Sequence, residues 1–97
     1  MPIYITLNRF TQQGIQNIKG SPDRLAAGKE AYRKAGAEVK AFFLVTGQYD
    51  MVEIIEAPDD ATMARLALAD ASRGNVRTET LRAFTEDEYR KIIAAIA

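Results

Sequence analysis

At the centre of the chain stands the stretch Thr46-Gly47-Gln48-Tyr49-Asp50, with the apolar segment Val39–Val45 before it and Met51–Ala57 after it. Both flanking segments are rich in β-branched, aromatic and aliphatic residues, which favour strands. The stretch between them contains a glycine and an aspartate, which favour tight turns. The sequence therefore predicts a central antiparallel hairpin, and this hairpin decides which strands are neighbours in the sheet.

Further strands and helices follow outward from this hairpin. A strand is predicted where apolar residues alternate with period two, and a helix where they recur every three or four residues behind a capping residue. On these rules the other elements are a strand over Ile3–Phe10, a short helix after Thr11, a helix from Ser21 as its cap to Gly36, a helix over Ala61–Arg73, a strand over Val76–Phe84, and a C-terminal helix behind a capping box of Thr85 and Glu88.

The order of these elements is β-α-β-β-α-β with one added helix, which predicts a single α+β, ferredoxin-like domain over residues 1–97. We expect a four-stranded antiparallel sheet in which the strands lie in the order 4-1-3-2. Right-handed crossovers place both connecting helices on one face of such a sheet. We expect the helices to cover the face that carries Ile3, Ile5 and Leu7.

The opposite face of the predicted sheet is too apolar to be left in water, and it also carries convergent polar groups. We expect it to stack against a second copy of the chain, which gives a homodimeric α/β barrel with a semi-polar interior. The residues assigned to this face are Tyr4, Thr6, Asn8, Met51, Glu53, Ile55, Thr80, Arg82 and one of Phe42 and Phe43.

The composition of the chain excludes several classes of function. Its 13 basic and 13 acidic residues cancel, which argues against a nucleic-acid partner. Cysteine and histidine are both absent, which excludes disulfides, thiolate ligands and histidine bases, so we expect no metal and no cofactor. No apolar run approaches the ~20 residues of a membrane span, and no leader-like pattern precedes the first strand, so we expect no membrane partner and a cytoplasmic location.

Several short motifs resemble those of the GYD-domain proteins. Gly47, Tyr49 and Asp50 match the family motif Gly-x-Tyr-Asp. The similarity extends over nearly the whole chain, through Phe10-Thr11, Gly14-Ile15, Asn17-Ile18-Lys19, Glu56-Ala57-Pro58-Asp59-Asp60, Gly74-Asn75-Val76-Arg77-Thr78 and Leu81-Arg82-Ala83-Phe84. This resemblance implies a dimeric α/β barrel. It implies no catalytic residues, because the family has none that are agreed.

Glu53 is the main candidate for chemistry, because it lies in mid-strand on the face assigned to the interior, where a carboxylate is paired or its pKa is raised. Arg82 is expected across the first strand from it, within one step of register. In one interpretation Glu53 is a general base, Arg82 holds an anion, and Tyr4, Thr6 and Asn8 orient a ligand. In the other, Glu53 and Arg82 form a buried ion pair at the dimer interface.

Tyr49 and Asp50 are the second candidate pair. They could supply a hydroxyl donor and an acid or base at the mouth of the barrel. The structural interpretation is the stronger one, because Gly47 supplies a positive φ, Asp50 bonds loop N–H groups and Tyr49 packs over the end of the hairpin.

These observations together predict a homodimeric domain that binds a small, partly apolar molecule between its stacked sheets. The first alternative is a cofactor-independent enzyme, an isomerase or a monooxygenase-like protein, that uses Glu53 as a general base. The second alternative is a purely structural or interaction dimer without a ligand.

Overall fold

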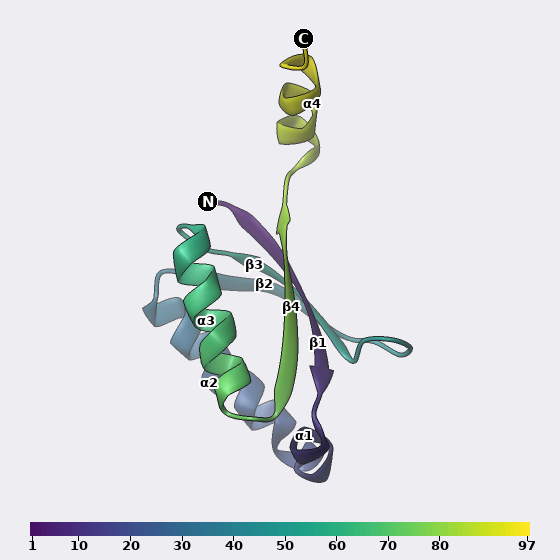
Figure 1. Cartoon of the computed structure of the whole chain (residues 1–97). Coiled ribbons are helices and arrows are strands. Elements are labelled where there is room, and N and C mark those ends of the chain that lie inside the picture. The colour runs from purple at the N-terminus through teal and green to yellow at the C-terminus, as the bar shows by residue number, and fades with distance from the viewer.

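The structure is a computed structural model that describes residues 1–97. Its four-stranded antiparallel sheet has the order β2-β3-β1-β4, as predicted, with the helices between the strands and a last helix beyond them (Figure 1). The strands are β1 over Ile3–Phe10, β2 over Glu38–Leu44, β3 over Met51–Glu56 and β4 over Val76–Ala83. The α+β, ferredoxin-like βαββαβ plan is therefore confirmed.

The helices begin and end close to their predicted bounds. They are α1 over Gln12–Gln16, a 3-10 turn η1 over Ile18–Gly20, α2 over Ser21–Lys34, α3 over Asp60–Ser72 and α4 over Glu86–Ala94. Thr11 caps α1, and Thr85 forms a capping box with Glu88 at the start of α4. The prediction that Ser21 caps α2 is wrong: η1 runs directly into α2, so Gly20 is the cap and Ser21 is already helical.

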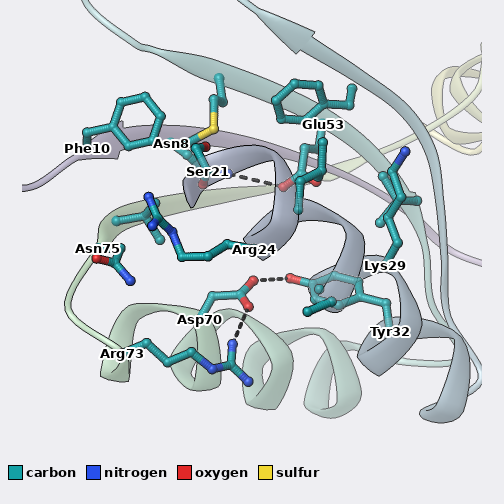
Figure 2. Close-up of a pocket in the computed structure, with 17 residues that line it drawn as sticks. Asn8, Phe10, Ser21, Arg24, Lys29, Tyr32, Glu53, Asp70, Arg73 and Asn75 are labelled. Carbon is teal, nitrogen blue, oxygen red and sulfur yellow. Dashed lines mark hydrogen bonds and ion pairs between the residues drawn. The ribbon is translucent and has the colours of Figure 1, made fainter. Parts of the chain in front are cut away.

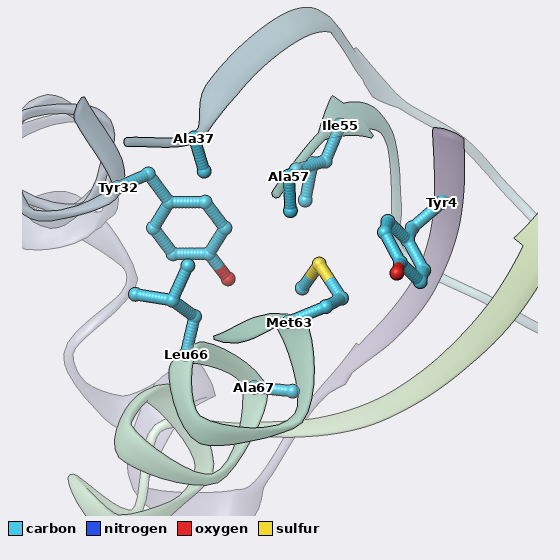
Figure 3. Close-up of a cluster of buried hydrophobic side chains, with 8 residues drawn as sticks. All are labelled: Tyr4, Tyr32, Ala37, Ile55, Ala57, Met63, Leu66 and Ala67. Atoms are coloured by element: carbon cyan, nitrogen blue, oxygen red, sulfur yellow. The ribbon is translucent and has the colours of Figure 1, made fainter. Parts of the chain in front are cut away.

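The helices cover the face of the sheet opposite to the one predicted. Tyr4 of β1 and Ile55 of β3 pack against Tyr32 of α2 and Met63 of α3 (Figure 3). The complete cluster of buried hydrophobic side chains is Tyr4, Tyr32, Ala37, Ile55, Ala57, Met63, Leu66 and Ala67. The face assigned to a stacked dimer is therefore the one on which α2 and α3 lie.

The physical reason for this error is that alternation sorts residues into two faces without saying which face the helices cover. The row Ile3, Ile5, Leu7 has the composition of a buried face, whereas the row with Thr6 and Asn8 contains polar groups. Those two polar residues are nevertheless buried, with exposed fractions of 2% and 6%. Their burial is possible because both donate hydrogen bonds to a half-buried residue of β3, as described below.

The uncovered face of the sheet carries a continuous apolar band across all four strands. Ile5 of β1 lies between Ile54 of β3 and Leu81 of β4, and Ala41 of β2 lies beyond Ile54. The neighbouring row is also apolar on three strands and consists of Leu7, Val52 and Phe43. This face is called the open face below.

The last helix, α4, projects away from the sheet and from α2 and α3 (Figure 1). Its apolar side chains all lie exposed: Tyr89, Ile92, Ile93 and, just beyond the helix, Ile96. No helix of the chain combines the length and the apolar character that a membrane crossing requires.

Candidate functional site

A cavity of about 220 Å³ lies between the helix-covered face of the sheet and α2, with the C-terminal end of α3 at its edge (Figure 2). Its apolar wall consists mainly of Phe10, Leu25, Val39, Phe42, Met51 and Val76. Its charged residues are Arg24, Lys29, Glu53, Asp70 and Arg73. This volume is below the roughly 300–1,000 Å³ of pockets for drug-sized ligands, so the cavity suits a smaller molecule.

Gly28 is one reason why the cavity is open. It lies in the middle of α2 and lines the cavity, and a Cβ atom added there would meet no other atom within 4 Å. A glycine inside a helix costs about 1 kcal/mol of stability relative to alanine. The helix therefore carries a destabilising residue at a position where a larger side chain would occupy the cavity.

Glu53 of β3 lies at the sheet side of the cavity, held by two residues of β1. Its Oε1 accepts a hydrogen bond from the Asn8 Nδ2 at 3.1 Å and a longer one from the Thr6 Oγ1 at 3.3 Å. Burial raises the pKa of the Glu53 carboxyl, and the negative charge of Asp70 raises it further. The structure thus brings together Glu53, Thr6 and Asn8 of the predicted site, but under the helices and within one chain.

Two buried polar atoms at the cavity have no hydrogen-bond partner, the Asn8 Oδ1 and the Arg24 Nη2. The other terminal nitrogen of Arg24, Nη1, donates to the backbone oxygen of Asn17 at 2.9 Å. Leaving a buried donor or acceptor unpaired costs about 1–3 kcal/mol, and more for a charged group. One free acceptor and one free cationic donor therefore remain on two residues that line the same cavity.

Asp70 of α3 forms the floor of the cavity in Figure 2. It accepts a hydrogen bond from the Tyr32 hydroxyl at 2.6 Å, and its other oxygen forms an ion pair with Arg73 at 3.1 Å. Burial raises the pKa of the Tyr32 hydroxyl strongly, and the bond to Asp70 adds to the rise. Since these groups satisfy one another, they tie α2 to α3 and fix the floor.

Tyr4 and Arg82 belong to a different group at the other end of the strands. The register places Arg82 opposite Tyr4, and Thr80 opposite Thr6, so Arg82 does not face Glu53. The Tyr4 hydroxyl donates to Asp60 at the start of α3, and the guanidinium of Arg82 lies over the Tyr4 ring at 5.6 Å. Burial, together with the bond to Asp60, raises the pKa of Tyr4 to about 12. The predicted ion pair of Glu53 with Arg82 is wrong.

Tyr49 and Asp50 also lie outside the cavity. The Tyr49 hydroxyl donates to Glu79 at 2.7 Å, and the Arg9 guanidinium lies 4.8 Å from its ring centre. Asp50 accepts a hydrogen bond from the backbone N–H of Phe10 at 2.9 Å. Gly47 has a φ of 108°, as the turn prediction required. These contacts fasten the hairpin across β1, which agrees with the structural interpretation of both residues.

Sequence reasoning missed four of the five charged residues of the cavity: Arg24, Lys29, Asp70 and Arg73. Arg24 and Asp70 lie on helices at positions where a charged residue ordinarily faces solvent, and only the packing of α2 and α3 turns them inward. Gly28 carried a usable signal, because it interrupts an apolar helical stripe in which Leu25 and Tyr32 face the sheet. No cluster of acidic residues has the arrangement of a metal site.

The residues of this fold agree with one family model. The model described as GYD domain matches residues 4–93. The chain belongs to the GYD-domain family. The matched residues include every residue of the cavity.

Two proteins of Thermus thermophilus are similar to this GYD domain. One is named "Glutamine synthetase and cystathionine beta-lyase binding protein", and it is 42% identical over 84 residues, which are 86% of this chain and 88% of that protein. The other is TTHA0845, whose crystal structure matches with a TM-score of 0.56 and 28% identity over 88% of this chain and 95% of that one. The first name describes a protein that binds enzymes.

Proposed function

We propose that this GYD domain is a homodimeric, cytoplasmic binding module that holds a small molecule in the cavity between its sheet and α2. One observation carries the proposal: Asn8 and Arg24, which both line the cavity, each have a buried polar atom, the Asn8 Oδ1 and the Arg24 Nη2, that has no partner within the chain. A ligand that pairs with both recovers the free energy that their isolation costs.

The size and the walls of the cavity support a small, partly apolar ligand. A space of about 220 Å³ holds a molecule of roughly ten non-hydrogen atoms. Ligand pockets are mostly apolar with a few placed polar groups, which is the composition found here. The predicted location between stacked sheets is replaced by this cavity inside one subunit, since Glu53 and Asn8 face α2.

Native mass spectrometry of the untagged protein, purified from its own host, tests the proposal. The wild type is expected to carry extra mass. The matched control is Gly28→Leu, which keeps the helix and places a side chain in the cavity; it is expected to be empty and at least as stable. Wild type without extra mass, both as isolated and after incubation with a host small-molecule extract, would overturn the proposal.

The open face supports the homodimer. Its apolar band, with Ile5, Ile54 and Leu81 at the centre, is the kind of surface that a soluble protein covers with a partner. Two copies of one chain that stack these faces make an isologous contact. The predicted dimer is thus kept, with the opposite face of the sheet at the interface.

The predicted catalytic alternative is tested in the same preparation. Glu53 would act as a general base on the bound molecule, and the Glu53→Gln variant would keep the hydrogen bonds from Thr6 and Asn8. Once the ligand is identified, turnover that wild type shows and Glu53→Gln lacks, with binding intact, would establish an enzyme. Equal recovery of unchanged ligand from both would establish a binding module.

A second candidate function is docking on an enzyme. It is supported by the 42% identity to a protein named for binding glutamine synthetase and cystathionine beta-lyase. The exposed apolar stripe of α4 is available for such a contact. Size-exclusion chromatography with each of the two purified enzymes from the same host tests it. Co-elution with an enzyme that is weakened in Ile92→Lys supports docking through α4. Elution separate from both enzymes contradicts it.

A further inference from the structure

The cavity carries groups of three kinds at three places (Figure 2). Arg24 of α2 crosses it and offers a cationic donor. Asn8 and Glu53, on the sheet side, offer oxygen acceptors. Aromatic and aliphatic side chains fill the wall between them. A ligand that satisfies all three needs an anionic group, a hydrogen-bond donor close to it, and an apolar part.

We propose that the ligand is a zwitterionic α-amino acid with an apolar side chain, whose carboxylate binds Arg24 and whose ammonium group binds the Asn8 Oδ1 and Glu53. This inference rests on the proposed function, because it names the class of molecule that the same cavity holds.

The Arg24 side chain selects the anionic group. Its Nη2 is fully buried without an acceptor, and no ion pair joins Arg24 to either acidic residue of the cavity. Asp70 is already held by Tyr32 and Arg73, and Glu53 by Thr6 and Asn8. A guanidinium in this position binds a carboxylate with charge-assisted hydrogen bonds, which are about twice as strong as neutral ones.

The acceptors select the ammonium group. Asn8 is buried, with 6% of its surface exposed, and its Oδ1 lacks a donor because its Nδ2 is already bonded to Glu53. A donor placed between the Asn8 Oδ1 and the Glu53 carboxylate contacts two oxygen atoms, one of which is charged when Glu53 is ionised. An ammonium group fits such a pair better than a hydroxyl, because it brings three donors and a positive charge.

The charges of the cavity agree with a zwitterion. Arg24 and Lys29 are opposed only by Glu53, since Arg73 and Asp70 form an ion pair with each other. A ligand without its own charges would leave Arg24 unpaired in a buried place, and a ligand with only a positive charge would face it directly. The wall, with Phe42 and Met51, takes an aliphatic side chain by burial.

Isothermal titration calorimetry with L-leucine as the probe and three matched analogues tests the proposal. The first analogue is 4-methylpentanoate, which lacks the ammonium group, and the second is 3-methylbutylamine, which lacks the carboxylate. The third is 2-hydroxy-4-methylpentanoate, which keeps the carboxylate and has a hydroxyl in place of the ammonium group. L-leucine is expected to bind, and the loss of either charged group is expected to weaken binding at least tenfold. The hydroxy acid is expected to lie between these limits.

A variant and a matched control test whether Arg24 binds the carboxylate of the ligand. In Arg24→Met, L-leucine and 3-methylbutylamine are expected to bind equally weakly, because the carboxylate has lost its partner. The matched control is Arg33→Met, an exposed arginine on the same helix that pairs with Glu30 outside the cavity, and it is expected to bind like wild type. Thermal unfolding of both variants checks that they are folded.

Each other outcome overturns the inference. Equal binding of all four probes would leave a small-molecule site and remove the zwitterion. Binding of none of them, while native mass spectrometry shows a different bound mass, would likewise remove the amino-acid class and keep the proposed function. Binding of none of them to a protein that is also empty, both as isolated and after incubation with the host extract, would overturn both.

Discussion

At the scale of single residues, two glycines with helical backbone have opposite roles. Gly14 in α1 has no room for a side chain, because an added Cβ atom would lie 2.0 Å from the backbone oxygen of Asn75. Gly28 in α2 has free space on the cavity side. The first glycine permits the close approach of α1 to the loop before β4, and the second leaves the cavity open.

Alanine at these two positions is expected to change stability in opposite directions. Gly14→Ala is predicted to destabilise the protein by about 1–3 kcal/mol, since backbone cannot move aside as a side chain does. Gly28→Ala is predicted to stabilise the empty protein by up to about 1 kcal/mol through helix propensity. Urea unfolding of both variants measures this. The same sign for both changes would contradict the packing described here.

Glu53 gives a prediction for the pH dependence of stability. Burial raises its pKa above the usual value of 4.5, so the folded chain binds this proton more tightly than the unfolded chain does. The stability from this group is therefore fully present below the unfolded pKa and is lost as the pH rises through the folded pKa. Glu53→Gln is expected to be more stable than wild type at pH 7, and the difference is expected to shrink towards pH 4.

Thermal unfolding of wild type and Glu53→Gln between pH 4 and pH 8 checks this. Glu86→Gln is a suitable control, because Glu86 lies exposed on α4 with Arg90 as its partner. A difference for Glu53→Gln that grows as the pH falls would contradict a carboxyl whose pKa is raised.

At the scale of elements, α1 and α4 differ in how they are attached. Thr11 caps α1 and also donates to the backbone oxygen of Gly74, so it joins the helix to the loop before β4. Thr85 caps α4 through a capping box with Glu88, but the apolar residues of α4 are exposed. Local capping therefore forms both helices, and only α1 is part of the packed body.

Removing the two caps is predicted to have unequal effects. Thr11→Ala is expected to lower the free energy of global unfolding by about 1–2 kcal/mol. Thr85→Ala is expected to leave it unchanged while the amides of α4 exchange faster. Urea unfolding and hydrogen exchange measure the two effects, and an equal loss of global stability in both variants would show that α4 is packed after all.

The elements and their order could be predicted from the sequence, because the signals for them lie within each segment. Examples are the alternating apolar residues of Ile3–Phe10 and the helix cap at Thr85. The face that the helices cover could not, since it depends on which side of β1 is packed by residues far along the chain, such as Tyr32 and Met63. Glu53 was found because a mid-strand carboxylate is unusual. Arg82 was wrongly predicted as its partner. Thr6 lies opposite Glu53, and the residue opposite Thr6 on β4 is Thr80, two residues before Arg82.

At the scale of the whole molecule, the two faces of the sheet have separate uses. The face under α2 and α3 contains the core and the cavity, so a ligand there touches a single chain. The open face is apolar across four strands and serves for contact with a second copy in the proposed dimer. Binding of the ligand and dimerisation are therefore expected to be separable.

A charge at the centre of the open face is predicted to separate them. Ile54→Lys is expected to convert the dimer to a monomer, because two lysines would be brought together at the isologous contact. Leu68→Lys is the matched control, since Leu68 is exposed on α3, away from this face. Light scattering after size exclusion measures the mass, and a dimeric Ile54→Lys protein would contradict an interface on this face.

A ligand that binds in the cavity under α2, as proposed, would be detected by the methyl groups of the methionines. The chain has three methionines: Met51 lines the cavity, Met63 lies in the core cluster, and Met1 is exposed at the N-terminus. Methyl NMR spectra of the labelled protein are recorded while the small-molecule fraction of a host extract is added. In the wild type, only the Met51 signal is predicted to shift, and in Gly28→Leu no signal is predicted to shift. A Met51 signal that stays in place in the wild type would show that no ligand binds in this cavity.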